Sequence, residues 1–469
     1  MRSSLSLALP FIALAAGCTV GPNYHPPEPH ISAAWTSPAG VGAVEEGAWW
    51  KSLNDPLLDA LVDEMLAGSP TLREAQARIV EARAALGAVR GSTGPQASLS
   101  GSVSETMLSK NGQLPIGSIP GFARDFALFD LGFDASWELD LWGRRTRSIE
   151  AANARTGQAE MAAQGARVQL IGELARAYVE LRLAQREKVL AQQAVETWQN
   201  LDQLTALRER VGEANRMESE RAGSDLANAR VAFANAEAAE RAAALRVAAL
   251  VGVEPAAVLP RIAAVAPIPA PPAAIAAGLP SELLRRRPDI HVAERDLAAA
   301  TADVGVATAD LFPRLRLGFS VGQQARAIGD LFNGDSTRLQ AGPGLSWPVF
   351  SGGSTRARIG IANARVDQAA ARYDAAIISA LSDSETAINR FDRALAALSA
   401  ADAGLARDEA GYVLAGRRAA VGEDDRLVLA RARLVQIQAL QRHAQSRAAA
   451  TEAAIGLNKA LGGGWKSGL

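Results

Sequence analysis

Two long stretches without proline constrain the fold of this chain most strongly. Residues 144–210 and 355–418 contain no proline and keep a helical hydrophobic period. At a rise of about 1.5 Å per residue, a helix of that length spans roughly 100 Å. Shorter helical patterns follow over residues 215–250 and 424–461. No compact domain is that wide, so the sequence predicts two long antiparallel helical hairpins that bury a seam of apolar side chains against neighbouring helices.

The chain is also a tandem duplication. Landmarks recur in the same order at one common offset: Trp137 and Trp347, Gly143 and Gly353, Asn153-Ala154-Arg155 and Asn363-Ala364-Arg365, and Val211-Gly212-Glu213 and Val421-Gly422-Glu423. We therefore predict a first structural repeat over residues 56–255 and a second over 281–465. Each repeat consists of a helix, a strand hairpin (96–141 and 314–350) and a long helical hairpin (143–252 and 353–461). Residues 256–280, rich in proline and alanine, are expected to form an irregular connector.

The first residues have the pattern of an export signal. An apolar run from Leu5 to Ala16 is too short for a transmembrane helix, so residues 1–17 are expected to be a cleaved signal peptide. Cys18 is the only cysteine in the chain, and Leu14-Ala15-Ala16-Gly17-Cys18 is similar to a bacterial lipobox. Cys18 is therefore predicted to carry lipid such as palmitate; the alternative is a plain secretory signal with an incidental cysteine. Residues 18–55 would then form an extended strap, and residues 466–469 a C-terminal tail.

Each repeat contains segments in which polar and apolar residues alternate. From Phe129 to Leu141 every odd residue is apolar and every even residue is polar or glycine. This pattern is typical of a strand with one apolar and one polar face. Similar alternation over residues 97–104, 315–321 and 339–349 predicts four strands in all, arranged as two isolated hairpins. The polar face of the 129–141 strand carries four acidic residues, namely Asp130, Asp134, Glu138 and Asp140.

Strands of this kind are long enough to cross a bilayer as part of a tilted β-barrel. A soluble β-sandwich is the alternative. Because roughly eight strands are the minimum for closure, four strands from one chain would need strands from further chains. Eight strands from a dimer would be filled by side chains, whereas twelve from a trimer could surround water. The four acidic residues would then line a lumen.

Composition and motifs argue against nucleic-acid binding and against enzyme activity. Lysine and arginine total 49 and aspartate and glutamate total 50, so no basic excess exists to neutralise phosphates, and no nucleic acid partner is expected. The four histidines form no His-Glu-x-x-His pattern, and no phosphate-binding or dinucleotide-binding glycine motif occurs in the sequence. The five methionines are scattered and indicate no metal relay. We therefore expect neither enzyme activity nor a cofactor or metal.

Four motifs are specific enough to compare with a known family. They are Cys18-Thr19-Val20-Gly21-Pro22-Asn23-Tyr24, Leu279-Pro280-Ser281-Glu282-Leu283-Leu284-Arg285-Arg286-Arg287-Pro288-Asp289, Leu311-Phe312-Pro313 and Ala460-Leu461-Gly462-Gly463-Gly464-Trp465. In these motifs the chain resembles the TolC-like outer membrane factors, specifically the lipoprotein branch (NodT-type) of resistance-nodulation-division efflux systems. The resemblance implies a mainly α fold with transmembrane β. Long antiparallel helices would form a trimeric α-barrel, four strands per chain a twelve-stranded outer-membrane β-barrel, and the connector part of an equatorial belt.

The resemblance also implies roles for the turns of the helical hairpins. Residues at both turns match the family's contact with a periplasmic adaptor, although glycine there also serves to end a helix; they are Val211, Gly212, Val421 and Gly422. Within 418–426, Glu423, Asp424 and Asp425 match the ring that narrows the periplasmic end. We hypothesise that these acids form a cation-selective gate. The alternative for them is a solvated turn.

We therefore predict the outer-membrane exit duct of a tripartite efflux pump, which passes drugs or other small molecules out of the periplasm. The partners implied are two further copies of the chain, a periplasmic adaptor (membrane fusion) protein, an inner-membrane resistance-nodulation-division transporter and outer-membrane lipid. One alternative keeps the fold and makes the chain a channel for type I protein secretion. Another is a periplasmic coiled-coil adaptor or structural protein, which would not need the alternating strands.

Overall fold

The chain folds into two compact units. The structure, a computed structural model, describes residues 19–29, 31–37, 47–109 and 123–465. The unit that we call the sheet unit comprises the described residues of Met1–Pro27, Ile79–Gln158 and Ala293–Tyr373. The second unit, the hairpin unit, comprises those of Glu28–Arg78, Ala159–Val292 and Asp374–Leu469.

The long helices confirm the helical hairpins predicted from the sequence. Helices α4 (Arg144–Arg210) and α9 (Ser354–Ala420) are each 67 residues long. They are followed by α5 (Arg216–Val251) and α10 (Arg426–Ala460). The other helical segments are η1 (Trp49–Leu53), α2 (Pro56–Gly68), α3 (Pro70–Ser92), α6 (Pro255–Ile262), η3 (Pro280–Glu282), α7 (Leu283–Arg286), α8 (Pro288–Ala309), η4 (Ile328–Asp330) and η5 (Gly334–Ser336).

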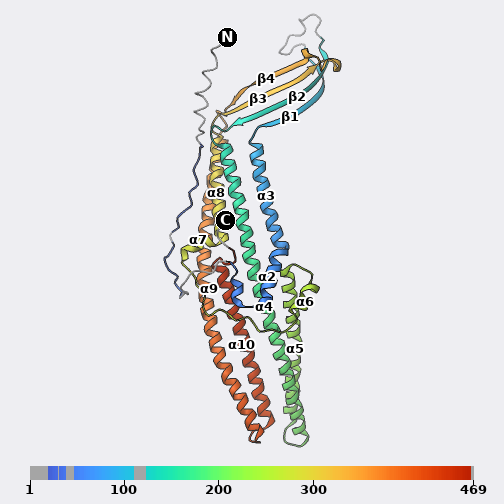
Figure 1. The fold of residues 1–469 in the computed structure, drawn as a ribbon, viewed down its shortest axis with the longest axis vertical. Coiled ribbons are helices and arrows are strands. Elements are labelled where there is room, and N and C mark those ends of the chain that lie inside the picture. Colours follow the sequence, from blue (N-terminus) through green and yellow to red (C-terminus); the bar gives the residue numbers. More distant parts are fainter. Residues whose placement is uncertain (1–18, 30, 38–46, 110–122, 466–469) are drawn as a thin grey trace. The chain divides into compact units, whose positions relative to one another are not determined.

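The sheet unit contains one antiparallel sheet of four strands. Its strands lie side by side in chain order (Figure 1): β1 (Gln96–Met107), β2 (Asp125–Leu139), β3 (Arg314–Ala325) and β4 (Thr337–Ser346). The prediction of two isolated hairpins was wrong, because β2 pairs with β3 from Phe129↔Ala325 to Leu139↔Leu315. Both strands alternate in the same phase, so pairing them continues the apolar face and the polar face across all four strands.

The last strand is shorter than the sequence pattern suggested. Alternation continues to Val349, but β4 ends at Ser346. Pro348 has no N–H group with which to continue the ladder. Trp347 instead turns its indole toward the end of α8 and donates a 3.0 Å hydrogen bond to the carbonyl of Leu311.

The connector is only partly irregular. Residues 255–262 form α6, whereas irregular structure was expected from residue 256 onward. Pro255 occupies the first helical position, where its missing N–H group is not needed. Val258 and Ile262 on this short helix are fully buried, so contact with the core stabilises a segment whose composition alone argues against a helix.

The core of the hairpin unit is formed by α2, α4, α5, α6 and α10. Its largest buried side chains include Trp49, Leu58, Leu61, Met65, Ile171, Leu174, Tyr178, Leu181, Val251, Ile262 and Ile455. Burial of each such side chain contributes about 1.5–3 kcal/mol to the stability of the fold. Helix α2, which supplies a large share of this core, is capped by Asp55, whose carboxylate accepts hydrogen bonds from the amides of Leu57 and Leu58.

A buried arginine attaches the connector to α4. Arg182 is 3% exposed and donates hydrogen bonds to the carbonyl of Ala264 (2.7 Å) and to the side chain of Gln185 (2.8 Å). It also donates to the hydroxyl of Tyr178, at 2.8 Å. Gln185 in turn donates to the carbonyl of Ile262 at 2.8 Å. These bonds satisfy backbone groups at the end of α6 that burial would otherwise leave unpaired.

We predict that Arg182→Met loosens the connector. The substitution leaves buried acceptors unpaired, and we expect a loss of about 2–4 kcal/mol in the local free energy of opening. Hydrogen exchange followed by mass spectrometry should show amides of residues 255–268 exchanging on the order of thirtyfold faster or more. Arg246→Met is the matched control, because that side chain is 56% exposed. Equal exchange in both variants would contradict the role given to Arg182.

Candidate functional site

Three of the four acidic residues predicted to line a lumen lie on the polar face of the sheet. In the register of β2 with β3, polar side chains face them: Asp130 lies opposite Gln324, Asp134 opposite Ser320, and Glu138 opposite Arg316. Directly opposed residues in an antiparallel pair point to the same face. The structure therefore brings these acids together with amide, hydroxyl and guanidinium groups.

An arginine that the sequence analysis did not single out joins three strands of this face. Arg338 of β4 reaches across β3 to Asp130 of β2, with hydrogen bonds of 3.0 Å from Nε and 2.7 Å from Nη2. Its path runs over Gly322 and Gly132, where a Cβ atom would lie 3.3 Å and 2.5 Å from the guanidinium group. The two glycines face each other in the register. The sequence signal for this contact was an arginine at a polar position of a strand, next to two glycines that face each other on the neighbouring strands.

The remaining acids of β2 have different partners. Glu138 lies 3.5 Å from the guanidinium of Arg316, and Asp134 accepts a 3.3 Å hydrogen bond from Ser100. Asp140 follows the end of β2, and its carboxylate accepts hydrogen bonds of 2.9 Å from the amides of both Arg145 and Thr146 in the first turn of α4. The polar face is therefore mixed in charge rather than uniformly acidic.

The opposite face of the sheet is apolar and uncovered within the described chain. Leu99, Val103, Leu339 and Leu345 are between 67% and 74% exposed. These residues lie on the two outer strands. Strands β1 and β4 each have a single neighbour in the described sheet, so each leaves one edge of backbone groups unpaired. Water is a poor environment for this combination of an apolar face and two open edges.

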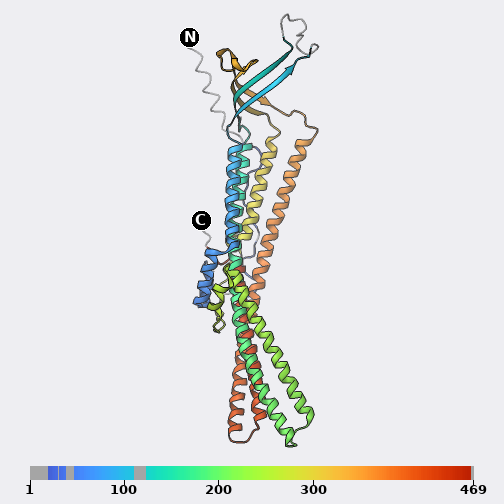
Figure 2. The same ribbon diagram turned by 90° about the vertical axis from the view of Figure 1, so that its right-hand side faces the viewer.

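The two hairpin turns have the same backbone geometry. Figure 2 shows that they lie at the same end of the hairpin unit. Gly212 and Gly422 both have φ of +79°. At the first turn, Glu213 N donates to Arg208 O at 2.8 Å and Gly212 N to Glu209 O at 3.0 Å, which is the Schellman motif. The second turn repeats these bonds, and Val211 and Val421 beside the glycines are 64% and 73% exposed.

The three acidic residues of the second turn lie close to arginines. Asp424 accepts two hydrogen bonds from Arg418, at 2.7 Å and 3.0 Å, and these hold the pKa of its carboxyl below the usual value. Glu423 is 3.9 Å from the same guanidinium. Asp425 begins α10 by accepting a hydrogen bond from the amide of Leu427, and it lies 3.8 Å from Arg208 of the other hairpin. The structure thus brings all three acids together at the tip.

The segment that follows Cys18 is held at the start of α4, although Cys18 itself lies outside the described residues. Val20 N donates to Trp142 O at 3.1 Å. Arg147, 4% exposed, donates to the side chain of Asn23 at 2.6 Å and to Val20 O at 3.3 Å. Gly143 has φ of +76°, and a Cβ there would lie 2.6 Å from Thr19. Arginines in the first turn of a helix interact unfavourably with the helix dipole. The run of arginines at the start of α4 therefore indicated a separate role for them, and the sequence analysis overlooked this signal for Arg147.

The described residues contain neither a cluster of metal ligands nor a helix that could span a membrane. No three histidine, aspartate or glutamate side chains in that part of the chain gather closely enough to hold a metal ion. None of the described helices combines the length and the apolar character required to cross a membrane.

Known proteins share this architecture. The chain matches the family described as outer membrane efflux protein over residues 61–253 and 279–463. Nodulation protein T of Rhizobium leguminosarum bv. trifolii is 29% identical over 386 residues, which cover 82% of this chain and 81% of that protein. The probable efflux pump outer membrane protein TtgC of Pseudomonas putida is 30% identical over 478 residues, covering 99% and 96%. The solved outer-membrane channel OprN is 34% identical with a TM-score of 0.84, covering 96% of this chain and 100% of that chain.

The chain therefore belongs to the outer membrane efflux protein family. The resemblance seen in its motifs is confirmed, as is the TolC-like fold of long helical hairpins with a four-stranded antiparallel sheet. The predicted class of function, an outer-membrane protein of efflux, is confirmed with it.

We predict that Gly212→Ala together with Gly422→Ala destabilises the tips. A side chain at positive φ costs roughly 1–2 kcal/mol per residue, so amides of both turns should exchange hydrogen several times faster. Gly411→Ala is the control, since a Cβ there meets no atom within 4 Å and its helical backbone favours alanine. Unchanged exchange at the tips of the double variant would show that the turns do not depend on glycine.

Proposed function

We propose that three copies of this chain form the exit duct of a tripartite efflux pump in the outer membrane. The observation that carries the proposal is the sheet with one exposed apolar face and two unpaired edges. Edge-to-edge pairing of three such sheets would give twelve strands, enough for a water-filled barrel. Strands of 10 to 15 residues are long enough to cross the hydrocarbon layer when tilted.

In this assembly the polar face lines the lumen. Asp130, Asp134 and Glu138 then contact water inside the barrel together with Arg316 and Arg338. Such a lining carries both charge signs and suits the passage of varied small molecules. The names of relatives such as TtgC, which describe efflux pump proteins of the outer membrane, support export as the function. The duct performs no chemistry and binds no cofactor.

The tips are the proposed site of contact with a periplasmic adaptor protein, which links the duct to an inner-membrane resistance-nodulation-division transporter. Val211 and Val421 are exposed beside the glycine turns. Exposed apolar residues next to rigid turns suit docking of a partner's helical hairpin. Gly212 and Gly422 leave room for a close approach, because no atom lies within 4 Å of a Cβ built at either.

Lipid on Cys18 is the proposed second attachment to the membrane. The support is the position of Thr19, which packs against Gly143 between the end of β2 and the start of α4. In a membrane-spanning barrel this junction marks the bilayer surface. An acyl chain on the preceding residue could insert there without a long linker.

We predict that Val211→Asp together with Val421→Asp abolishes efflux but not assembly. A charge at an apolar contact opposes docking, so cells that lack this gene and carry the variant should accumulate ethidium as fast as the deletion strain. The amount of variant in the outer-membrane fraction should equal that of the wild type. Val231→Asp is the control, because Val231 is 60% exposed but lies away from the turn. Normal efflux by the double variant would contradict the adaptor contact.

Glu423, Asp424 and Asp425 are proposed to form the cation-selective gate at the periplasmic end. Three copies bring like charges together, and the ion pair with Arg418 keeps Asp424 ionised.

We predict that the triple variant Glu423→Gln, Asp424→Asn and Asp425→Asn, in planar bilayers with a potassium chloride gradient, moves the reversal potential toward zero. Glu213→Gln, at the matching position of the first repeat, should leave it unchanged. An unchanged potential in the triple variant would reject the gate.

A further inference from the structure

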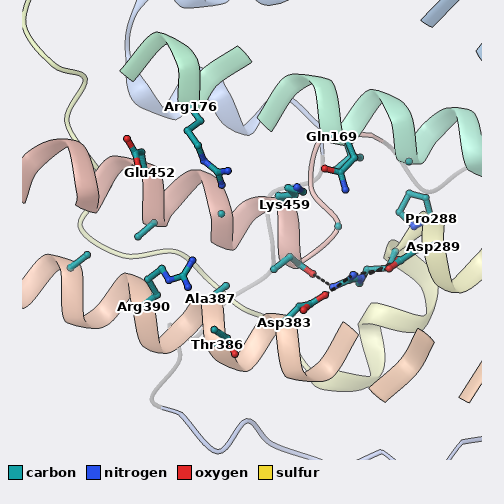
Figure 3. A pocket seen from close by; sticks show the side chains of 18 of the residues that line it. Gln169, Arg176, Pro288, Asp289, Asp383, Thr386, Ala387, Arg390, Glu452 and Lys459 are labelled. Atoms are coloured by element: carbon teal, nitrogen blue, oxygen red, sulfur yellow. Dashed lines mark hydrogen bonds and ion pairs between the residues drawn. The ribbon is translucent and has the colours of Figure 1, made fainter. Parts of the chain in front are cut away.

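A large cavity in the hairpin unit has no assigned role. It has a volume of about 800 Å³ and is lined by α4, α9, α10 and the start of α8 (Figure 3). Cavities of this size commonly hold small organic molecules. Its wall combines alanines, such as Ala387, Ala449 and Ala453, with several charged side chains.

One cluster of charges in the wall is already balanced. Arg287, with a side chain 12% exposed, makes hydrogen bonds of 3.0 Å and 2.6 Å to Asp289 and lies 3.3 Å from Asp383. It also donates to the carbonyl of Ala460 at 3.2 Å. Arg287 thus engages two of the three acids that line the cavity, and one of these, Asp383, also acts on Lys459.

Three other cations of the wall are Arg176, Arg390 and Lys459. Within the described part of the chain, the side chain of none of them makes a hydrogen bond or a contact ion pair. The stem of Lys459 packs against α4, with its Cδ 3.4 Å from a Cβ built at Gly172. Arg176 lies one turn further along the same face of α4. Burial and the nearby charge of Arg176 lower the pKa of Lys459.

The third acid does not neutralise these cations. Glu452 lies near Arg176, but burial and the charge of Glu180 raise the pKa of its carboxyl. Arg176 and Lys459 therefore repel each other, and the carboxylates of Glu173 and Asp383, which act on Lys459, do not outweigh burial and this repulsion. An anion between the two cations would relieve this repulsion and would gain charge-assisted hydrogen bonds.

The geometry points to a binding site for an organic anion, one with carboxylate or sulfonate groups on an apolar body, held by Arg176, Lys459 and Arg390. Gln169 and Thr386 offer neutral hydrogen bonds, and the alanines contact the apolar body. This inference rests on the proposed export function and deepens it, because it makes the cavity a binding site for anionic cargo.

The probe for the test is pyrenetetrasulfonate, which is fluorescent and too polar to enter detergent micelles. We expect saturable binding to the full chain in detergent, measured by fluorescence anisotropy. Arg176→Gln and Lys459→Gln should each weaken binding about tenfold. Arg442→Gln is the control on α10, because its side chain is 61% exposed and paired with Asp408. Lys459→Arg keeps the charge and should retain binding, which separates loss of the site from loss of the fold.

Two results would overturn the inference. No saturable binding by the wild type would overturn the inference, and this is the result expected if a second copy of the chain fills the cavity. Equal binding by the wild type and the Arg176→Gln, Lys459→Gln double variant would overturn it as well. Conductance in planar bilayers tests the duct separately: a wild type that conducts but does not bind the probe removes the anion site and leaves the proposed function standing.

Discussion

The two unpaired edges of the four-stranded sheet are the constraint on which the account of this protein depends. Strands β1 and β4 each have one neighbour in the described sheet, and leucines and valines on one face are mostly exposed. In a bilayer, unpaired backbone groups cost several kcal/mol each, so such a sheet is stable there only when its edges are closed. The closure proposed above, by further copies of the chain, would account for the small number of strands in each chain.

Arginines compensate the charge of surfaces that the sequence alone suggested were acidic. Asp130 is paired with Arg338, and Asp424 with Arg418, in both cases through two hydrogen bonds. Paired acids hold fixed positions and stay ionised, whereas closely spaced unpaired acids would repel one another. The cavity beside Lys459 differs, because the side chains of Arg176, Arg390 and Lys459 make no hydrogen bond or contact ion pair within the described chain.

Much of this architecture could be predicted from the sequence, because period and proline placement are local signals. The bounds of α4 were predicted correctly, since no proline or glycine-rich break interrupts that stretch. Features that depend on packing could not be predicted. Helix α6 forms because Val258 and Ile262 reach the core, and the β2–β3 pairing joins segments far apart in the chain. The reach of Arg338 across β3 needed the register that sets Gly132 opposite Gly322. Cys18 lies outside the described residues, and its lipid stays a prediction.

The number of chains in the assembly decides whether the sheet edges are closed by further copies. Light scattering combined with absorbance and refractive index gives the protein mass of a detergent complex independently of the bound detergent. We expect about three times the mass of the mature chain, because twelve strands are needed to surround a water-filled lumen. A single chain that stays stable in solution without detergent would exclude the duct, since the edges of its sheet would then be open and its apolar face uncovered.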